Sequence, residues 1–96
     1  MNIIYEQMKD LIPQKRIFKE REEHEFLILM SKSNSIHYLN SVAKEFYLNI
    51  NGVNSIQNIF DMILNDYDVP REELENDILE LIRDLQWKEL ITLKVK

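Results

Sequence analysis

The segment from residue 38 to residue 59 constrains the fold of this chain most, because it passes from a strand into a helix and then turns toward a second helix. Leu39 ends an apolar stretch, and Asn40 follows it as a favourable N-cap for a helix. Gly52 is the only glycine of the chain and marks a turn. This strand-to-helix junction and the turn after it indicate a mixed α and β domain.

Three strands are predicted before the Leu39-Asn40 step, over residues 17–19, 24–30 and 35–39. The second strand is apolar on both faces, which favours a covered position in a sheet. Residues 31–34 have the composition of a hairpin turn. The third strand is short and mixed in polarity, which favours an edge position.

Three helices and a last strand are predicted after that step, over residues 41–50, 56–66, 70–88 and 90–95. Either Asn54 or Ser55 caps the second helix, and Pro70 suits the first turn of the third. The expected core faces are Val42, Ala43, Phe46 and Ile50, then Ile56, Ile59, Phe60, Ile63 and Leu64, then Leu74, Ile78, Leu81 and Leu85. The order predicts an α+β fold: a winged helix-turn-helix with an N-terminal three-stranded antiparallel β-meander, three helices and a short C-terminal strand.

Residues 1–12 form a weakly amphipathic segment that ends at Pro13. Two interpretations are open for it, a frayed tail or a short helix laid on the domain. We therefore divide the chain into an N-terminal extension, 1–15, and one domain, 16–96.

The composition excludes several functional classes. The chain of 96 residues has no cysteine, so it has no disulfide framework, thiolate metal site or cysteine nucleophile. No apolar run approaches the length of a membrane span, and the N-terminus lacks the pattern of a signal peptide, so we expect a cytoplasmic protein. No phosphate loop or catalytic triad is present, and His24 and His37 make a poor metal site by themselves. We expect no enzyme activity, no cofactor and no metal.

Negative charge is concentrated in the helical half of the chain. Residues 1–44 carry seven Lys or Arg and six Asp or Glu (+1), whereas residues 45–96 carry five and eleven (−6). DNA binding depends largely on phosphate contacts from Lys and Arg. The segment 56–66 has neither residue, and 71–88 has six acids against three basic residues. These charges argue against nucleic acid as a partner.

Several short motifs resemble the pattern of the PqqD-like family, the peptide-recognition elements of ribosomal peptide natural-product pathways. They cover about residues 16–93, and their order and spacing carry the resemblance. The matching positions are Leu39-Asn40, Ala43, Gly52, Ser55-Ile56, Tyr67-Asp68-Val69, Leu74, Ile78, Leu81-Ile82 and Leu85. The sequence departs from the pattern at Glu89-Leu90, where the family usually closes its last helix with Gly-Leu.

This resemblance implies a non-catalytic protein that binds the leader of a precursor peptide and presents the core to a modifying enzyme, often a radical enzyme that uses S-adenosylmethionine. It also implies that the leader adds as a strand beside the third strand, in a groove closed by the third helix. Two alternatives remain open. One is a winged-helix DNA-binding regulator, and the other is a docking adaptor without leader binding.

The residues themselves point to two candidate parts of a peptide site. The strand 35–39 lacks the proline, lysine or acid that usually protects an edge, unless residues 1–12 or the C-terminal strand cover it. In the last helix, a second stripe flanks the core seam and predicts either an apolar groove floor, with Arg83 at its lip, or a wide core face. The candidate peptide-binding residues are Ser35, Ile36, His37, Tyr38, Leu39, Glu75, Ile78, Leu79, Ile82, Arg83 and Gln86.

Overall fold

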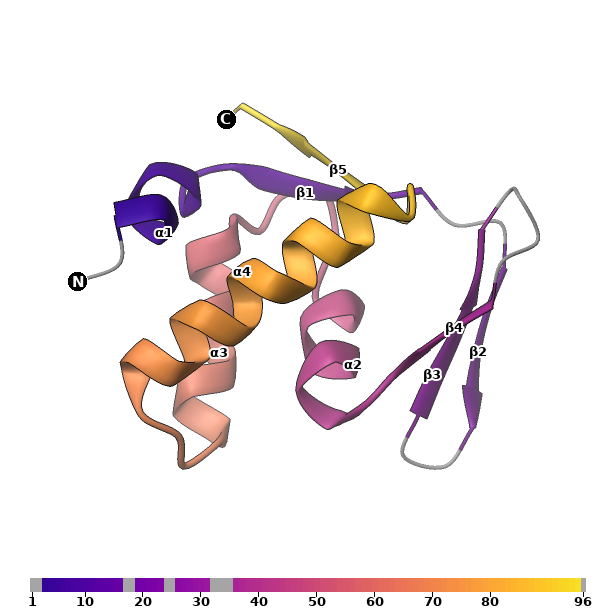
Figure 1. The fold of residues 1–96 in the computed structure, drawn as a ribbon, viewed down its shortest axis with the longest axis horizontal. Helices are drawn as coiled ribbons and strands as arrows, with labels where there is room; N and C mark the ends of the chain where they lie inside the picture. Colours follow the sequence, from indigo (N-terminus) through magenta and orange to yellow (C-terminus); the bar gives the residue numbers. More distant parts are fainter. Residues whose placement is uncertain (1–2, 17–18, 24–25, 32–35, 96) are drawn as a thin grey trace.

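The computed structural model describes residues 3–16, 19–23, 26–31 and 36–95, and these form two small sheets and four helices (Figure 1). In chain order the elements are α1 (Ile3–Met8), β1 (Ile12–Lys15), β2 (Lys19–Glu23), β3 (Phe26–Met30), β4 (Ile36–Leu39), α2 (Ser41–Leu48), α3 (Ile56–Asp66), α4 (Arg71–Trp87) and β5 (Ile91–Lys94). The predicted α+β class is confirmed.

The predicted β-meander is confirmed as an antiparallel sheet in the order β2-β3-β4. Leu27 pairs with Leu39 and Ile28 pairs with Tyr38, so β3 is the central strand. Leu27 and Leu29 are both 0% exposed, because this face of the sheet packs on the helices. Of the predicted strand and turn positions, 17–18, 24–25 and 32–35 lie outside the described residues.

A second sheet, which the sequence did not predict, joins the two ends of the chain. β1 pairs antiparallel with β5, with Pro13 opposite Leu93 (Figure 1). Proline is tolerated here because, among the described strands, β1 pairs with β5 alone and is therefore an edge strand. The backbone N–H of Arg16 also donates to the Leu90 carbonyl at 2.8 Å.

The helix α1 is part of the same hydrophobic core as the helices that follow. Tyr5 is 1% exposed, and its ring centroid lies 5.0 Å from that of Phe60. The backbone N–H of Gln57 donates to the carbonyl of Lys9 at 2.9 Å, which ties α3 to the segment after α1. Residues 3–15 therefore share a core and a sheet with the rest of the chain.

The connection from α2 to α3 is built from local hydrogen bonds. Gly52 has a φ of 81°, a conformation that a residue without Cβ adopts readily. The side chain of Asn51 accepts from the backbone N–H groups of Val53 and Asn54. Ser55 then forms a reciprocal capping box with Asn58, so Ser55 is the N-cap of α3. Asn40 occupies the N-cap position of α2, but its side chain makes no capping hydrogen bond.

At the end of α4 lies Glu89, the position where the sequence has glutamate and the family pattern has glycine. The N–H of Leu90 donates to the Leu85 carbonyl at 2.8 Å and that of Glu89 to the Gln86 carbonyl at 3.0 Å, which is the Schellman pattern. Glu89 has a φ of 60°, in the left-handed region where this motif usually holds glycine. The helix thus ends where the family pattern implies, with a strained residue at the closing position.

Candidate functional site

The strand β4 forms an open edge of the three-stranded sheet. Within the described parts of the chain, β4 pairs only with β3, while β1 and β5 pair with each other. The N-terminal segment and the C-terminal strand therefore leave this edge uncovered. The sequence of β4, Ile36 to Leu39, contains no proline, lysine or acid. Its outward backbone groups are available to an incoming strand.

A groove of about 490 Å³ runs between this edge and α4. Its apolar floor consists of Leu39, Ala43, Leu81 and Leu85, and polar or charged groups line its walls, namely His37, Asn40, Asp84 and Lys88. Phe26, Ile36 and Tyr38 complete the lining at the sheet. An extended peptide paired with β4 could therefore place a side chain on this floor.

The structure corrects the predicted groove floor on α4. Ile78 and Ile82 are both 0% exposed and belong to the core, whereas Leu81, which we expected in the core seam, lines the groove. With about 100° per residue, Leu81 lies about 60° to one side of Ile78 and Leu79 about 100° to the other side. The flank with Leu81 faces β4, and the flank with Leu79 faces away from it.

The other flank of α4 packs near α1 and forms a separate pocket of about 530 Å³. Leu79, Arg83 and Gln86 line this pocket together with Ile4 and Met8. The structure therefore does not bring these three predicted residues to the β4 edge. The sequence could not show this arrangement, because it depends on where α1 docks.

Glu75, also in the predicted set, is a buried structural residue. Its side chain is 8% exposed, and its carboxylate lies 3.4 Å from the Arg71 guanidinium. Arg71 in turn lies over the ring of Phe60, with 5.1 Å between guanidinium carbon and ring centroid. This cluster stabilises the start of α4 and lies outside the groove.

The groove continues between α4 and the start of α2. This second part, of about 410 Å³, shares Asn40, Ala43, Leu81 and Asp84 with the first. Val42, Asp77 and Glu80 complete its lining. Sequence reasoning missed Asp77 and Glu80 because it selected a stripe on the other flank of the core seam, namely Glu75, Leu79, Ile82 and Gln86. Their spacing from Leu81 along the helix was the available signal.

His37 is the polar residue of β4 that faces the groove. Its Nε2 atom is buried and has no hydrogen-bond partner among the described residues. Burial lowers the pKa of His37, and the charge of Lys88 lowers it further, while Asp84 acts in the opposite direction. The imidazole is therefore neutral near pH 7 and can hydrogen-bond a peptide group in the groove.

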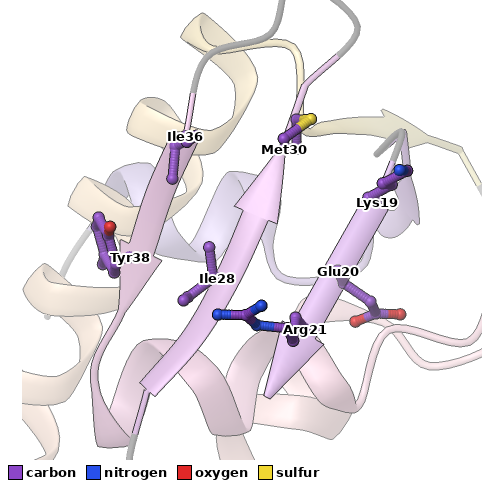
Figure 2. Close-up of a pocket in the computed structure, with 7 residues that line it drawn as sticks. All are labelled: Lys19, Glu20, Arg21, Ile28, Met30, Ile36 and Tyr38. Carbon is purple, nitrogen blue, oxygen red and sulfur yellow. The ribbon is translucent and has the colours of Figure 1, made fainter. Parts of the chain in front are cut away.

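The outer face of the same sheet has an apolar strip on β3 and β4 beside charged residues of β2, and Figure 2 shows both. Ile28 and Met30 of β3 lie beside Ile36 and Tyr38 of β4, and this face is hollowed into a pocket of about 580 Å³. Ile36 is 52% and Tyr38 68% exposed. A strand added to β4 would point alternate side chains into the groove and onto this outer face.

Across the described residues, no three His, Cys, Asp or Glu side chains come together as metal ligands. No described helix has the length and apolar character needed to cross a membrane. His24, the second histidine, lies outside the described residues.

One protein-family model matches most of the chain. The model of PqqD, described as coenzyme PQQ synthesis protein D, matches residues 25–91, which span the sheet strand β3 through the first residue of β5. The chain belongs to the PqqD family. The resemblance seen in the sequence is thus confirmed, and the groove lies entirely within the part that matches the PqqD model.

Among solved structures, this PqqD-family chain is similar to TbiB1 in complex with the TbiA(beta) leader peptide. The TM-score is 0.72 at 20% sequence identity, over 83% of this chain and 93% of that one. At this identity the likeness establishes the shared PqqD fold. Among curated proteins, no sequence is a significant match.

Proposed function

We propose that this chain binds the leader segment of a ribosomally made precursor peptide and presents it to a modifying enzyme, without catalysis of its own. The observation that carries the proposal is the unprotected β4 edge beside an apolar groove. Family membership and the fold shared with a leader-bound protein support it.

Binding would proceed by strand addition. The leader would pair its backbone with Ile36–Leu39, which supplies affinity with little dependence on leader sequence. One leader side chain would enter the groove over Leu81 and Leu85, which supplies specificity. The peptide-binding set we now propose is Ile36, His37, Tyr38, Leu39, Ala43, Leu81, Asp84, Leu85 and Lys88.

Titration calorimetry with the leader of a precursor peptide encoded beside this chain tests the proposal. We expect a dissociation constant of roughly 10 nM to 10 μM, because the interface is at the small end of the usual range. The matched control is the chain with Leu81→Glu, which places a charge on the groove floor. Absence of heat with the wild-type chain, together with leader binding by the partner enzyme alone, would contradict the proposal.

The DNA-binding alternative is disfavoured by the groove and by charge. The helix α3 carries no Lys or Arg, and the exposed side of α4 at the groove presents Asp77, Glu80 and Asp84. These carboxylates would repel a phosphate backbone. A docking adaptor without leader binding remains the outcome that a negative titration would favour.

A further inference from the structure

The two ends of the groove differ in charge. The part beside β4 and the part beside α2 share four lining residues, so they form one continuous channel. Near the start of β4 the channel is lined by His37 and Lys88. Near the start of α2 it is lined by Asp77 and Glu80, and Asp84 lies between the two ends. A peptide in this channel would meet a cation at one end and carboxylates at the other.

The acidic end is available to a ligand. Asp77 and Glu80 are exposed, and no ion pair is found for either one among the residues that the structure describes. Asp84 instead approaches Lys88, with 3.8 Å between carboxylate oxygen and ammonium nitrogen. Asp77 lies one helical turn before Leu81 and Glu80 one turn before Asp84, and both acids line the channel. Glu80 also borders the pocket on the α1 side, so it lies between the two flanks of α4.

The apolar floor determines which leader residues come close to the charged ends of the channel. A side chain seated over Leu81 lies between the two charged ends, with Asp77 and Glu80 on one side and Lys88 on the other. Neighbouring leader residues on the same face of an added strand are two positions apart, roughly 6–7 Å along the strand. A residue two positions from the anchor would therefore come near one charged end.

We propose that the channel selects leaders in which the apolar anchor residue is flanked, on the side of Asp77 and Glu80, by a lysine or arginine. This inference rests on the proposed leader binding and adds the charge of the ligand to it. An acidic residue at that flank is rejected, because it would face two carboxylates in the channel. The flank near Lys88 accepts neutral or acidic residues.

Selection from a library of random 15-residue peptides tests this inference directly. We expect the wild-type chain to enrich peptides with an apolar residue and a Lys or Arg at a fixed spacing on one side. The double variant Asp77→Lys/Glu80→Lys should enrich Asp or Glu at the same position. The control Asp61→Lys/Asp66→Lys changes net charge equally on α3, away from the channel, and should keep the wild-type preference.

Synthetic peptides from the selection then quantify the effect. Replacing the flanking Lys by Glu should weaken binding to the wild-type chain about tenfold, a size typical of a few exposed ion pairs. In the double variant the same replacement should strengthen binding. In about 0.5 M NaCl the difference should shrink, because exposed charges are screened. If Asp77→Lys/Glu80→Lys does not fold, Asp77→Asn/Glu80→Gln should abolish the preference.

The outcomes separate the two proposals. Selected peptides that bind β4 and the groove with no charge preference would overturn the inference and leave leader binding intact. Unchanged preference in Asp77→Asn/Glu80→Gln would also overturn it. A lower melting temperature of this variant without any change in preference would mean that the acids serve the start of α2 instead. Failure of the wild-type chain to enrich any peptide would overturn leader binding as well.

Discussion

The two edges of the three-stranded sheet are protected very differently. The edge strand β2 has the sequence Lys-Glu-Arg-Glu-Glu, so all five of its residues are charged. Two of its carboxylates reach neighbouring elements: Glu20 lies 3.7 Å from Lys15 of β1, and Glu22 lies 3.5 Å from Lys44 of α2. The opposite edge, β4, has the sequence Ile-His-Tyr-Leu and carries no such charge.

This difference shows which edge is closed by the protein itself. Charged residues on an edge strand discourage pairing with another chain. An unprotected edge favours aggregation unless a partner covers it. Among the described residues, the groove formed with α4 lies beside β4 and has no lining residue from β2. We therefore interpret β2 as the protected edge and β4 as the edge that receives a ligand.

Proline substitutions should separate the two edges most strongly. Outward N–H groups alternate along an edge strand, so either His37 or Tyr38 directs its N–H away from β3. Proline at the inward residue should destabilise the domain by about 3 kcal/mol, because it removes a ladder hydrogen bond and restricts φ. Proline at the outward residue should weaken leader binding by about 1–3 kcal/mol with little loss of fold.

The matching experiment on β2 uses Arg21→Pro and Glu22→Pro. One of these substitutions also removes an outward N–H, and we expect it to leave leader affinity unchanged. Calorimetry and thermal melting of all four variants give the comparison. Equal loss of affinity from the outward proline of each edge would break the distinction between β2 and β4.

A negative charge introduced on α4 should weaken leader binding only on the flank that faces β4. Leu81→Glu should weaken leader binding by about 1–3 kcal/mol, because the carboxylate must be desolvated when the anchor side chain enters. Leu79→Glu is the matched control on the opposite flank, and it should leave affinity unchanged. A loss of affinity in Leu79→Glu alone would mean that the leader binds between α1 and α4.

A substitution outside both edges should raise stability without changing affinity. Glu89 closes α4 in the left-handed region, with φ of 60°. Glu89→Gly should stabilise the domain by about 0.4–1 kcal/mol, because glycine adopts this conformation without strain from Cβ. Glu89→Ala removes the same charge but keeps Cβ, so it should give no comparable gain. Thermal melting distinguishes these variants, and a change in leader affinity would show that this helix end also affects the β4 groove.

The smallest expected effect is a pH dependence at β4. The folded pKa of His37 is lowered, so the unfolded chain binds the proton more readily. The contribution of His37 to stability is therefore complete above its unfolded pKa of about 6.5 and is lost as pH falls through the folded pKa. His37→Gln should show a shallower loss of stability on acidification. Identical urea-unfolding profiles for the two chains from neutral pH downward would contradict this assignment.

The sequence predicted most of the fold because its signals are local. The cap at Ser55, one of the two expected positions, the single glycine at position 52 and Pro70 at the start of α4 all act within one or two turns of chain. The helix α3 was predicted with the same limits that the structure shows. The pairing of β1 with β5 was missed, because it joins segments at the two ends of the chain.

Of the candidate site, the β4 edge could be predicted from the sequence and the groove residues of α4 could not, for a related reason. The open edge at Ile36–Leu39 follows from its composition and its place at the end of a meander. Which residues of α4 line the groove depends on how the helix is rotated about its own axis. Its apolar stripe is wide enough to allow two such rotations. Packing of Ile82 in the core and of α1 against Leu79 decides between them. Neither contact is encoded by spacing alone.

Amide hydrogen exchange along the two edge strands tests the central claim most directly. With saturating leader, alternate N–H groups of β4, either those of Ile36 and Tyr38 or those of His37 and Leu39, should become protected. The N–H groups of Lys19–Glu23 in β2 should exchange at the same rates with and without leader. Unchanged exchange at all four residues of β4, or new protection along β2 instead, would contradict strand addition at the unprotected edge.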